Sequence, residues 1–239
     1  MFCYELLNYS IFVILKNMKA MILAAGFGTR LKPYTESTPK ALIPYRSKPM
    51  VNYQIERLLN AGVNEIVINA HHHGKLIQEY FSKNDFGVKI NLIIEKDILG
   101  TGGGILNAEK FLKDEEDFIV INVDVITNMN LADMIKFHNI ENSFATLAIQ
   151  KRKTSRHLEF DKQKKLIGKE NETSKINNLY AFNGIHIISN RIFENNLEVR
   201  FRGILEIYFK LIQKKGVSIL GFDTGDCTFK DIGKIENLE

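Results

Sequence analysis

The sequence predicts an α/β protein: a Rossmann-like, three-layer αβα unit with a mostly parallel central sheet and an added β-rich portion. Between residues 20 and 123, apolar runs of strand length alternate four times with segments of helical periodicity. This pattern is typical of a parallel sheet with helices on both faces. The runs are apolar along their length, as expected of strands buried on both sides. After residue 143 the runs become shorter and more closely spaced, which indicates hairpins.

The elements of the first half are expected in the following order. Residues 20–25 are apolar and lead into Gly26, which predicts a buried strand. Residues 48–62 predict a helix, because apolar residues recur at helical spacing between Pro49 and Gly62. The segments that follow predict a strand at 65–69, a helix at 75–81, a strand at 88–94, a helix that follows the glycine run and includes Leu112, and a strand at 118–123.

The second half is expected to be richer in strands. Strands are predicted at 145–150, 158–161, 164–168, 181–189, 217–222 and 228–233. One helix is expected among them, with Leu205, Tyr208, Phe209 and Ile212 on one face. The sequence contains no repeat, low-complexity tract or linker, so residues 18–239 are expected to form a single domain.

The first 17 residues need a separate explanation. Their apolar run, residues 11–15, is far shorter than the ~20 residues that span a membrane. The segment also lacks the basic region and the cleavage site of a secretory signal. Because Met18 begins a segment that leads directly into the first strand, we expect residues 1–17 to be an N-terminal extension, either a start-site artefact or a loosely packed arm.

Charge and cysteine content restrict the possible partners. The net charge of +4, from 32 basic and 28 acidic residues, is too small and too scattered for nucleic acid, although it suits anionic small substrates. Cys3 and Cys227 have neither metal-site nor disulfide spacing, which favours the cytoplasm. We expect no membrane partner, and the sequence leaves open whether the chain is a monomer or a homo-oligomer.

The segment LAAGFGTRLKP, residues 23–33, is similar to a phosphate-binding loop but lacks the requirements of the two common types. A dinucleotide loop needs a third glycine where this chain has Leu31, and an acidic residue about 20 positions further on. A Walker loop needs G-K-[ST] at its end. The segment therefore predicts an anion-binding loop of another kind.

The residues of this segment suit phosphate in a different way. Gly26 and Gly28 allow positive φ and close backbone approach, so that N–H groups at a strand–helix junction can face an anion. Arg30 adds a planar fork for phosphate oxygens, and Lys40 is a second cation for the same anion. The alternative is a solvated loop with an ordinary surface arginine.

The longer segment LAAGFGTRLKPYTESTPKALIP, residues 23–44, resembles the signature of the sugar-1-phosphate nucleotidyltransferases. This family makes NDP-sugars from an NTP and a sugar 1-phosphate. The segments KPMVNYQIERLLNAGVNEIVIN, LGTGGGI, NVDV, FNGIHIIS and FKDIG also match, so the resemblance covers residues 18–238. The chain is most similar to the compact members that act on mannose, heptose or N-acetylmuramic acid 1-phosphates. The resemblance implies a nucleotide-diphospho-sugar transferase fold of the GT-A-like type and GTP or UTP as the nucleotide.

The resemblance also implies which residues bind the nucleotide. Those of the loop are Leu23, Ala24, Ala25, Gly26, Gly28 and Thr29. In the segment LGTGGGI, Thr101, Gly102 and Gly103 are expected to face the base and ribose, and Glu95 is expected in the same pocket. A flexible turn is the alternative interpretation of the glycines.

Two aspartates are candidate ligands for Mg²⁺. Asp124 follows a buried strand and should emerge at the carboxyl end of the sheet, and Asp231 also lies near a strand end. Mg²⁺ binds through one or two carboxylates together with phosphates and water. A cap or turn is the alternative from the residues alone, whereas the resemblance implies that both bind the metal. Val123 stands where the family has the glycine of N-G-D, and histidines 71–73 lack the spacing of zinc ligands.

The acceptor side is expected in the second half of the chain. The resemblance implies that Asn183 and Gly184 contact the sugar and that Glu206 accepts a sugar hydroxyl, unless Glu206 is an ordinary exposed helix residue. Many relatives bind the sugar phosphate with the lysine of an E-K-P triplet, which this chain lacks. Lys169 is one candidate substitute, and the basic stretch of residues 151–165 offers another in Arg156, although a solvated hairpin is the alternative for most of this stretch.

Together these assignments predict a nucleotidyl transfer. An oxygen of the sugar phosphate would attack the α-phosphorus of the NTP in line and release pyrophosphate, without a side-chain nucleophile or base. Mg²⁺ on the two aspartates and Lys40 would act on the reacting phosphates, and Arg30 would hold the leaving pyrophosphate. The alternatives are a phosphocholine cytidylyltransferase and a regulatory paralogue that binds nucleotide-sugar without turnover.

Overall fold

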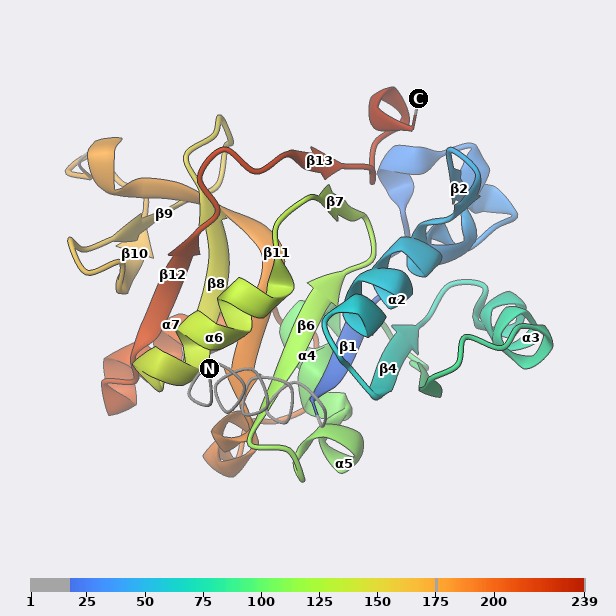
Figure 1. The fold of residues 1–239 in the computed structure, drawn as a ribbon, viewed down its shortest axis with the longest axis horizontal. Coiled ribbons are helices and arrows are strands. Elements are labelled where there is room, and N and C mark those ends of the chain that lie inside the picture. The colour runs from blue at the N-terminus through green and yellow to red at the C-terminus, as the bar shows by residue number, and fades with distance from the viewer. Residues whose placement is uncertain (1–17, 175, 239) are drawn as a thin grey trace, which may run out of the picture.

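The central feature of the computed structural model is a nine-stranded sheet (Figure 1). The structure describes residues 18–174 and 176–238, so the predictions for residues 1–17 lie outside the described residues. The strands of the sheet are β1 (Lys19–Leu23), β4 (Glu65–Ala70), β5 (Lys89–Ile94), β6 (Asp117–Asn122), β8 (Ala145–Gln150), β9 (His157–Phe160), β10 (Leu166–Lys169), β11 (Leu179–Ser189) and β12 (Ile219–Asp223).

Most neighbouring strands of the sheet are parallel in the half that begins the chain. β1 lies between β4 and β6 and is parallel to both, and β5 is parallel to β4. The long strand β11 runs antiparallel to β6 on one side and to β8 on the other, and β12 pairs in parallel with β8. β9 and β10 continue the sheet from the first residues of β11. The prediction of an α/β fold with a mostly parallel sheet is thus confirmed.

Helices cover both faces of the sheet. They are α2 (Met50–Asn60), α3 (Gly74–Lys83), α4 (Gly100–Asn107), α5 (Glu109–Leu112), α6 (Leu131–Glu141) and α7 (Ile204–Lys215). One core contains Ile22 of β1 with residues of α2, α3 and α6, and the other contains Met21 with residues of α4, α5 and α7 (Figure 1). Consecutive residues of β1 therefore point into different cores, which is why the strand is apolar throughout. None of the helices described is long and apolar enough to cross a membrane.

Several predicted elements differ from those in the structure. The predicted helix after the glycine run is broken at Ala108 into α4 and α5. Helix α6 was not predicted, although Asn130 caps it by accepting a hydrogen bond from the N–H of Ala132 at 2.9 Å. The glycine loop leads into a 3₁₀ turn, Thr29–Leu31, and not into an α-helix. The residues directly after the loop therefore supply no α-helix dipole to an anion bound by the loop.

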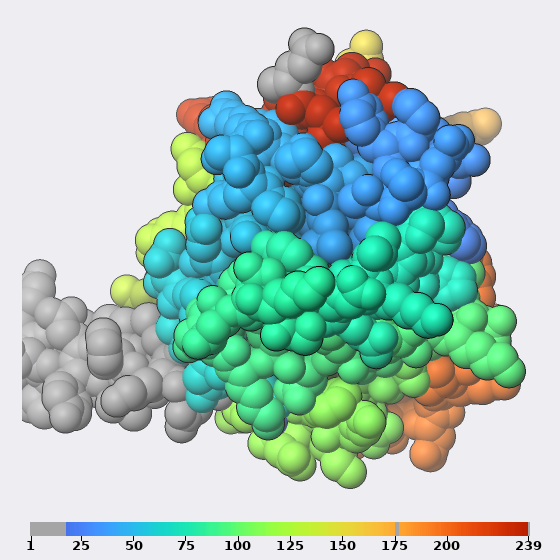
Figure 2. Space-filling view, turned by 90° about the vertical axis from the view of Figure 1, so that its right-hand side faces the viewer, coloured from blue at the N-terminus to red at the C-terminus, as the bar shows by residue number. Residues whose placement is uncertain are grey.

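Two small sheets lie outside the central one. The first is a hairpin of β2 (Pro44–Tyr45) and β3 (Lys48–Pro49). The second joins β7 (Val125–Thr127) to β13 (Phe229–Asp231) in antiparallel register, with Asp231 opposite Val125. Figure 2 shows the C-terminal residues, in red, lying against the blue segment that follows β1. The pairing of β7 with β13 brings Asp231 to the edge of the central sheet at which Asp124 emerges.

The glycine run at residues 102–104 is explained by packing. All three glycines are buried, and a Cβ on Gly103 would overlap the carbonyl oxygen of Arg200. A Cβ on Gly102 would lie only 2.9 Å from the carbonyl oxygen of Gly203. The carbonyl of Arg202 accepts the N–H of Gly102 at 2.9 Å. The glycines therefore let the chain before α7 lie directly on the first turn of α4.

We expect Gly103→Ala to lower the free energy of unfolding by about 1–3 kcal/mol, because the methyl group meets a backbone carbonyl that cannot rotate away. Urea-induced unfolding is the measurement. Gly168→Ala is the matched control, since a Cβ there would have no neighbouring atom within 4 Å. Equal unfolding midpoints for the two variants would contradict this account of the glycine run.

Candidate active site

A cavity of about 200 Å³ lies at the carboxyl ends of β1, β4 and β6. This is the edge at which open α/β sheets place their ligands. Its lining comes from the glycine loop, the strand ends and the loop before α4. The lining residues are Leu23, Ala24, Ala25, Gly26, Lys40, Asn69, Ile98, Gly100, Thr101, Asn122, Val123 and Asp124.

Some of the residues predicted to bind the nucleotide line this cavity, and others pack against neighbouring parts of the chain. Leu23, Ala24, Ala25, Gly26 and Thr101 line the cavity, whereas Gly102 and Gly103 face the chain before α7. Beyond the lining, Gly28 and Thr29 form the turn that shapes the loop.

Gly28 is required by the conformation of this loop. Its φ is +63°, and a Cβ there would lie 2.7 Å from Cγ2 of Thr35. The carbonyl of Gly28 accepts the Thr35 hydroxyl at 3.0 Å and the N–H of Leu31 at 2.8 Å. A larger residue would be strained at this φ and would displace Thr35.

Asn69 and Glu95 hold two walls of the cavity together. The side-chain oxygen of Asn69 accepts the N–H of Ala24 at 2.9 Å, and its Nδ2 donates to Glu95 Oε1 at 2.7 Å. Glu95 Oε2 accepts the N–H of Leu99 at 3.1 Å. A Cβ on Gly104 would lie 2.8 Å from Asn69 Nδ2, so this glycine makes room for the pair. Glu95, predicted as a nucleotide contact, thus acts on the glycine loop and on the loop before α4.

The Asn69–Glu95 pair is buried, with residue exposures of 2% and 4%. Burial raises the pKa of the Glu95 carboxyl, although the hydrogen bonds from Asn69 and Leu99 and the nearby His71 oppose this rise. Asn69 was not predicted as a site residue from the sequence. The signal that could have found it was a polar residue at the end of the apolar segment EIVINA.

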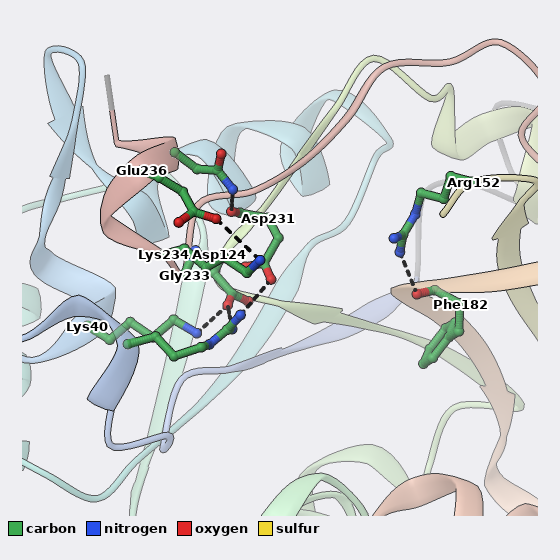
Figure 3. Close-up of polar contacts among 10 residues, drawn as sticks. Lys40, Asp124, Arg152, Phe182, Asp231, Gly233, Lys234 and Glu236 are labelled. Carbon is green, nitrogen blue, oxygen red and sulfur yellow. Dashed lines mark hydrogen bonds and ion pairs between the residues drawn. The ribbon is translucent and has the colours of Figure 1, made fainter. Parts of the chain in front are cut away.

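Two aspartates and two cations meet beside the cavity (Figure 3). Lys40 Nζ donates to Asp124 Oδ2, and Arg30 Nη1 donates to Asp231 Oδ2 at 3.0 Å. Arg30 Nη2 also lies 3.8 Å from Asp124 Oδ2. The structure therefore brings together Arg30, Lys40, Asp124 and Asp231, which were predicted from three separate segments. The two positive charges balance the two negative charges.

The two carboxylates and Arg30 converge on the space next to Gly233. A Cβ at Gly233 would overlap Asp124 Oδ2 and lie 2.9 Å from Asp231 Oδ1 and 3.0 Å from Arg30 Nη2. The N–H of Gly233 donates to Asp231 Oδ1 at 2.9 Å. Burial raises the pKa of the Asp231 carboxyl, but the hydrogen bonds from Arg30 and Gly233 and the charges of Arg30 and Lys40 outweigh it and leave this pKa lowered.

This donor set fits Mg²⁺ better than zinc. Two neighbouring carboxylates, of which Asp124 lines the cavity, suit a cation that takes its other ligands from phosphate oxygens and water. Among the described residues, no group of three or more His, Cys, Asp and Glu side chains is arranged to hold a metal. In the histidine run, His71 bonds the carbonyl of Glu95 at 3.0 Å and His73 that of Glu36 at 3.1 Å.

The three residues predicted to contact the sugar, Asn183, Gly184 and Glu206, differ from one another in their surroundings. Asn183 is buried, and its Nδ2 donates to Thr224 Oγ1 at 3.3 Å. Gly184 has a φ of +73°, and a Cβ there would lie 2.5 Å from Asn122 Nδ2. Glu206 lies in the first turn of α7, where its exposed carboxylate is 3.4 Å from Arg200 Nη2.

Arg152 is a half-buried cation that was not predicted from the sequence. Its Nε donates to Asn183 Oδ1 at 3.1 Å and its Nη2 to the carbonyl of Phe182 at 3.2 Å. The guanidinium lies 3.9 Å from the ring centroid of Phe229, and Figure 3 shows it across from the aspartate cluster. Burial lowers its pKa, which the charge of Asp231 opposes.

The two candidate cations named from the sequence have other surroundings. Arg156 is exposed, and Lys169 Nζ lies 5.6 Å from the ring centroid of Phe209 on α7. In the run KRK that follows β8, Lys151 and Lys153 are exposed and Arg152 is half-buried, which is the alternation that a continued strand would give. This alternation is the one sequence signal that separates Arg152 from the other cations.

Comparison with known proteins gives one family. A model of the family described as nucleotidyl transferase matches residues 19–166. The catalytic subunit beta of mannose-1-phosphate guanylyltransferase from Dictyostelium discoideum is 38% identical over 136 residues, which are 56% of this chain and 38% of that protein. The mannose-1-phosphate guanyltransferase of Neurospora crassa is 34% identical over 73% of this chain and 47% of that protein. The chain thus spans less than half the length of these two relatives.

Solved structures extend the similarity over more of the chain. HddC from Yersinia pseudotuberculosis, in a crystal structure with GMP-PN, superposes with a TM-score of 0.75 at 26% identity, over 92% of this chain and 96% of that one. UDP-glucose pyrophosphorylase complexed with UDP-glucose gives a TM-score of 0.75 at 21% identity, over 92% and 95% of the two chains, which supports the fold alone. The resemblance inferred from the sequence is confirmed at the level of the family.

The buried Glu95 predicts a pH-dependent difference in stability between the wild type and Glu95→Gln. Because the folded-state pKa of this carboxyl is raised, the carboxyl contributes to the free energy of unfolding. This contribution is fully present below the ordinary pKa of 4.5 and is lost as the pH rises through the raised pKa. The unfolding free energy of the wild type minus that of Glu95→Gln should therefore fall as the pH rises above 4.5. The fall should be about 1.4 kcal/mol for each pH unit that separates the folded-state pKa from the ordinary one.

Urea unfolding at several pH values measures this difference. The contributions of the other titrating groups are the same in both proteins and therefore cancel. Glu79→Gln, at an exposed position of α3, is the control, and the corresponding difference should be nearly flat. A constant difference for Glu95→Gln across the same range would show that its carboxyl has an ordinary pKa.

Proposed function

Because this chain belongs to the nucleotidyl transferase family, we propose that it transfers a nucleotidyl group from an NTP to a sugar 1-phosphate and releases pyrophosphate. The observation that carries the proposal is the meeting of Arg30, Lys40, Asp124 and Asp231 beside the cavity of the glycine loop. Phosphoryl chemistry needs this combination, since anionic substrates require cations and a metal requires carboxylates.

We assign the cavity to the nucleotide. Small residues, Ala24, Ala25 and Gly26, leave space for close approach of the backbone to phosphates, and Thr101 also lines the cavity. GTP is the nucleotide favoured by the similarity to mannose-1-phosphate guanylyltransferases and to a protein crystallised with GMP-PN, and UTP is the second choice. Nucleoside triphosphates are available in the cytoplasm, where we expect the protein to act.

We propose that Asp124 and Asp231 hold Mg²⁺, which when bound would neutralise charge on the α-phosphate. In the structure the same carboxylates are neutralised by Arg30 and Lys40. A cation bound by the aspartates would free the N–H groups of Arg30 and Lys40 for phosphate oxygens. Arg30, half-exposed, would then hold the leaving pyrophosphate, and Lys40 the reacting phosphates.

The chemical step needs no base from the protein. A phosphate oxygen of the sugar 1-phosphate forms a bond to the α-phosphorus as the bond to the pyrophosphate oxygen breaks. The attacking oxygen already carries negative charge, so no proton has to be removed. The contribution of the side chains is to hold the two phosphates in line and to balance their charge.

We assign the phosphate of the sugar substrate to Arg152. Its guanidinium is oriented by Asn183 and the carbonyl of Phe182 and lies on the Asp231 side of the acceptor half. Lys169 and Arg156 are less suitable, because the former lies near Phe209 and the latter is exposed. Asn183, which receives the hydrogen bond of Arg152, would then act on the substrate mainly by fixing this cation.

A matrix of NTPs and sugar 1-phosphates with Mg²⁺, scored by pyrophosphate release, tests the proposed reaction. We expect the highest rates with GTP or UTP, and a loss of kcat of about 10²–10³-fold or more in Asp124→Asn, which keeps the shape but removes the charge. Asp226→Asn, at an exposed position, is the control. Pyrophosphate release only with CTP and phosphocholine, or binding of nucleotide-sugar without turnover, would overturn the proposal.

The assignment of Arg152 predicts a selective effect on the sugar substrate. Arg152→Ala removes a charge-assisted hydrogen bond, so the KM for sugar 1-phosphate should rise about 10- to 100-fold while the KM for the NTP changes little. Arg156→Ala, four residues away and exposed, is the matched control and should behave as the wild type. Steady-state kinetics with each substrate varied in turn measure both values. Equal effects on the two substrates would show that Arg152 supports the fold and not the acceptor phosphate.

A further inference from the structure

Strand β7 carries the chain away from Asp124, and only one of its edges has a strand neighbour in the described part of the chain. Carbonyl groups alternate between the two edges of a strand. The carbonyl of Asp124 accepts the N–H of Ile232 at 2.9 Å, on the side of β13. The carbonyls of Val125 and Thr127 therefore belong to the opposite edge of β7, which faces α2, and those of Val123 and Met129 extend the same row beyond the strand.

Gln54 of α2 occupies the beginning of this opposite edge. It is fully buried, and its Nε2 donates to the carbonyl of Val123 at 3.2 Å and to that of Val125 at 2.7 Å. These are the residues immediately before and after Asp124. Both amide hydrogens of one side chain thus hold the backbone on either side of the carboxylate.

Arg57, one helical turn later, continues the same pattern. Its Nη2 donates to the carbonyl of Thr127, and its Nη1 donates to that of Met129 at 3.1 Å. Burial lowers the pKa of Arg57, and among the described residues no carboxylate forms an ion pair with it. The guanidinium is therefore placed for the backbone carbonyls and not for a charged partner.

We propose that Gln54 and Arg57, together called the clamp, hydrogen-bond the edge of residues 123–129 where a strand would otherwise pair. The two side chains are thereby positioning residues for the carboxylates of Asp124 and Asp231. Their four donors match four carbonyls in alternate positions along one edge of residues 123–129. The other edge of the same segment carries β13, with Asp231 opposite Val125. Fixing this segment fixes Asp124 directly and Asp231 through the strand pair. The role of the pair in catalysis rests on the proposed function, whereas the clamp itself does not.

The unused oxygen of Gln54 supports a role beyond filling space. Oε1 of Gln54 is buried and has no hydrogen-bond partner among the described residues. A buried acceptor without a partner is unfavourable, and an apolar side chain of the same size would avoid it. The position therefore uses the two N–H donors of the amide, which no apolar side chain offers.

Hydrogen exchange followed by mass spectrometry tests the clamp without any turnover. In Gln54→Met, which keeps the length of the side chain but removes both donors, we expect amide exchange in residues 123–129 and 229–232 to be at least tenfold faster than in the wild type. Gln213→Met, at an exposed position of α7, is the matched control and should leave these peptides unchanged. Exchange at the wild-type rate in Gln54→Met would overturn the proposal.

A second variant protects the test against a failure of Gln54→Met to fold. Arg57→Lys keeps the charge of a half-buried side chain but not its two-pronged geometry, so exchange should accelerate mainly in residues 127–129. If this variant exchanges as the wild type does, Arg57 has no part in the clamp.

Kinetics then separate the clamp from the proposed function. In an active wild type, Gln54→Met should raise the Mg²⁺ concentration needed for half-maximal rate and lower kcat at least tenfold, with little change in the KM for sugar 1-phosphate. If exchange is faster but the Mg²⁺ requirement is unchanged, Gln54 does not position the carboxylates. If the wild type releases no pyrophosphate with any substrate, the proposed function fails, while the exchange experiment still decides whether the clamp exists.

Discussion

The proximity of two carboxylates is the constraint on which the rest of this site depends. Asp124 and Asp231 share the space beside Gly233, and like charges at such short range are unfavourable unless they are neutralised. Arg30 and Lys40 supply that neutralisation in the structure. The glycine loop, the 3₁₀ turns after it and the β7–β13 pair can all be understood as the means of bringing these four charges together. The sheet supplies a rigid edge from which Asp124 emerges.

Much of the fold could be predicted because strands buried on both faces and amphipathic helices leave distinct patterns. Helix α6 and strand β7 were missed for different reasons. α6 follows an asparagine cap and has Leu131, Met134 and Ile135 on its buried face, so its signal was present. β7 has only three residues, too few for any periodicity, and its place depends on a partner about a hundred residues further on. Predictions about residues 1–17 and about a single domain stay predictions.

The site shows a similar division. Arg30, Lys40, Asp124 and Asp231 were singled out from short motifs, and the structure brings them together, although their roles stay predictions. Asn69 and Arg152 were not assigned, because their sequence signals are weak and their importance comes from what they touch: Ala24 and Glu95 for Asn69, Asn183 and Phe229 for Arg152. Gly102 and Gly103 show the opposite case, since a glycine run signals close approach without saying whether a ligand or the chain itself approaches.

The pairing of β7 with β13 has a consequence for the order in which the molecule assembles. The walls of the cavity come from β1, β4, β6 and their loops, all within the first 124 residues, whereas the second carboxylate lies at residue 231. Contacts between residues so distant in the chain carry the entropy of closing a long loop and tend to form late in folding. We therefore expect a partly folded molecule to possess the cavity before it possesses the carboxylate pair. Such an intermediate would expose the edge of β7 that β13 later covers, and an exposed strand edge can pair with other chains and cause aggregation. The docking of β13 would cover this edge in the same step that completes the site.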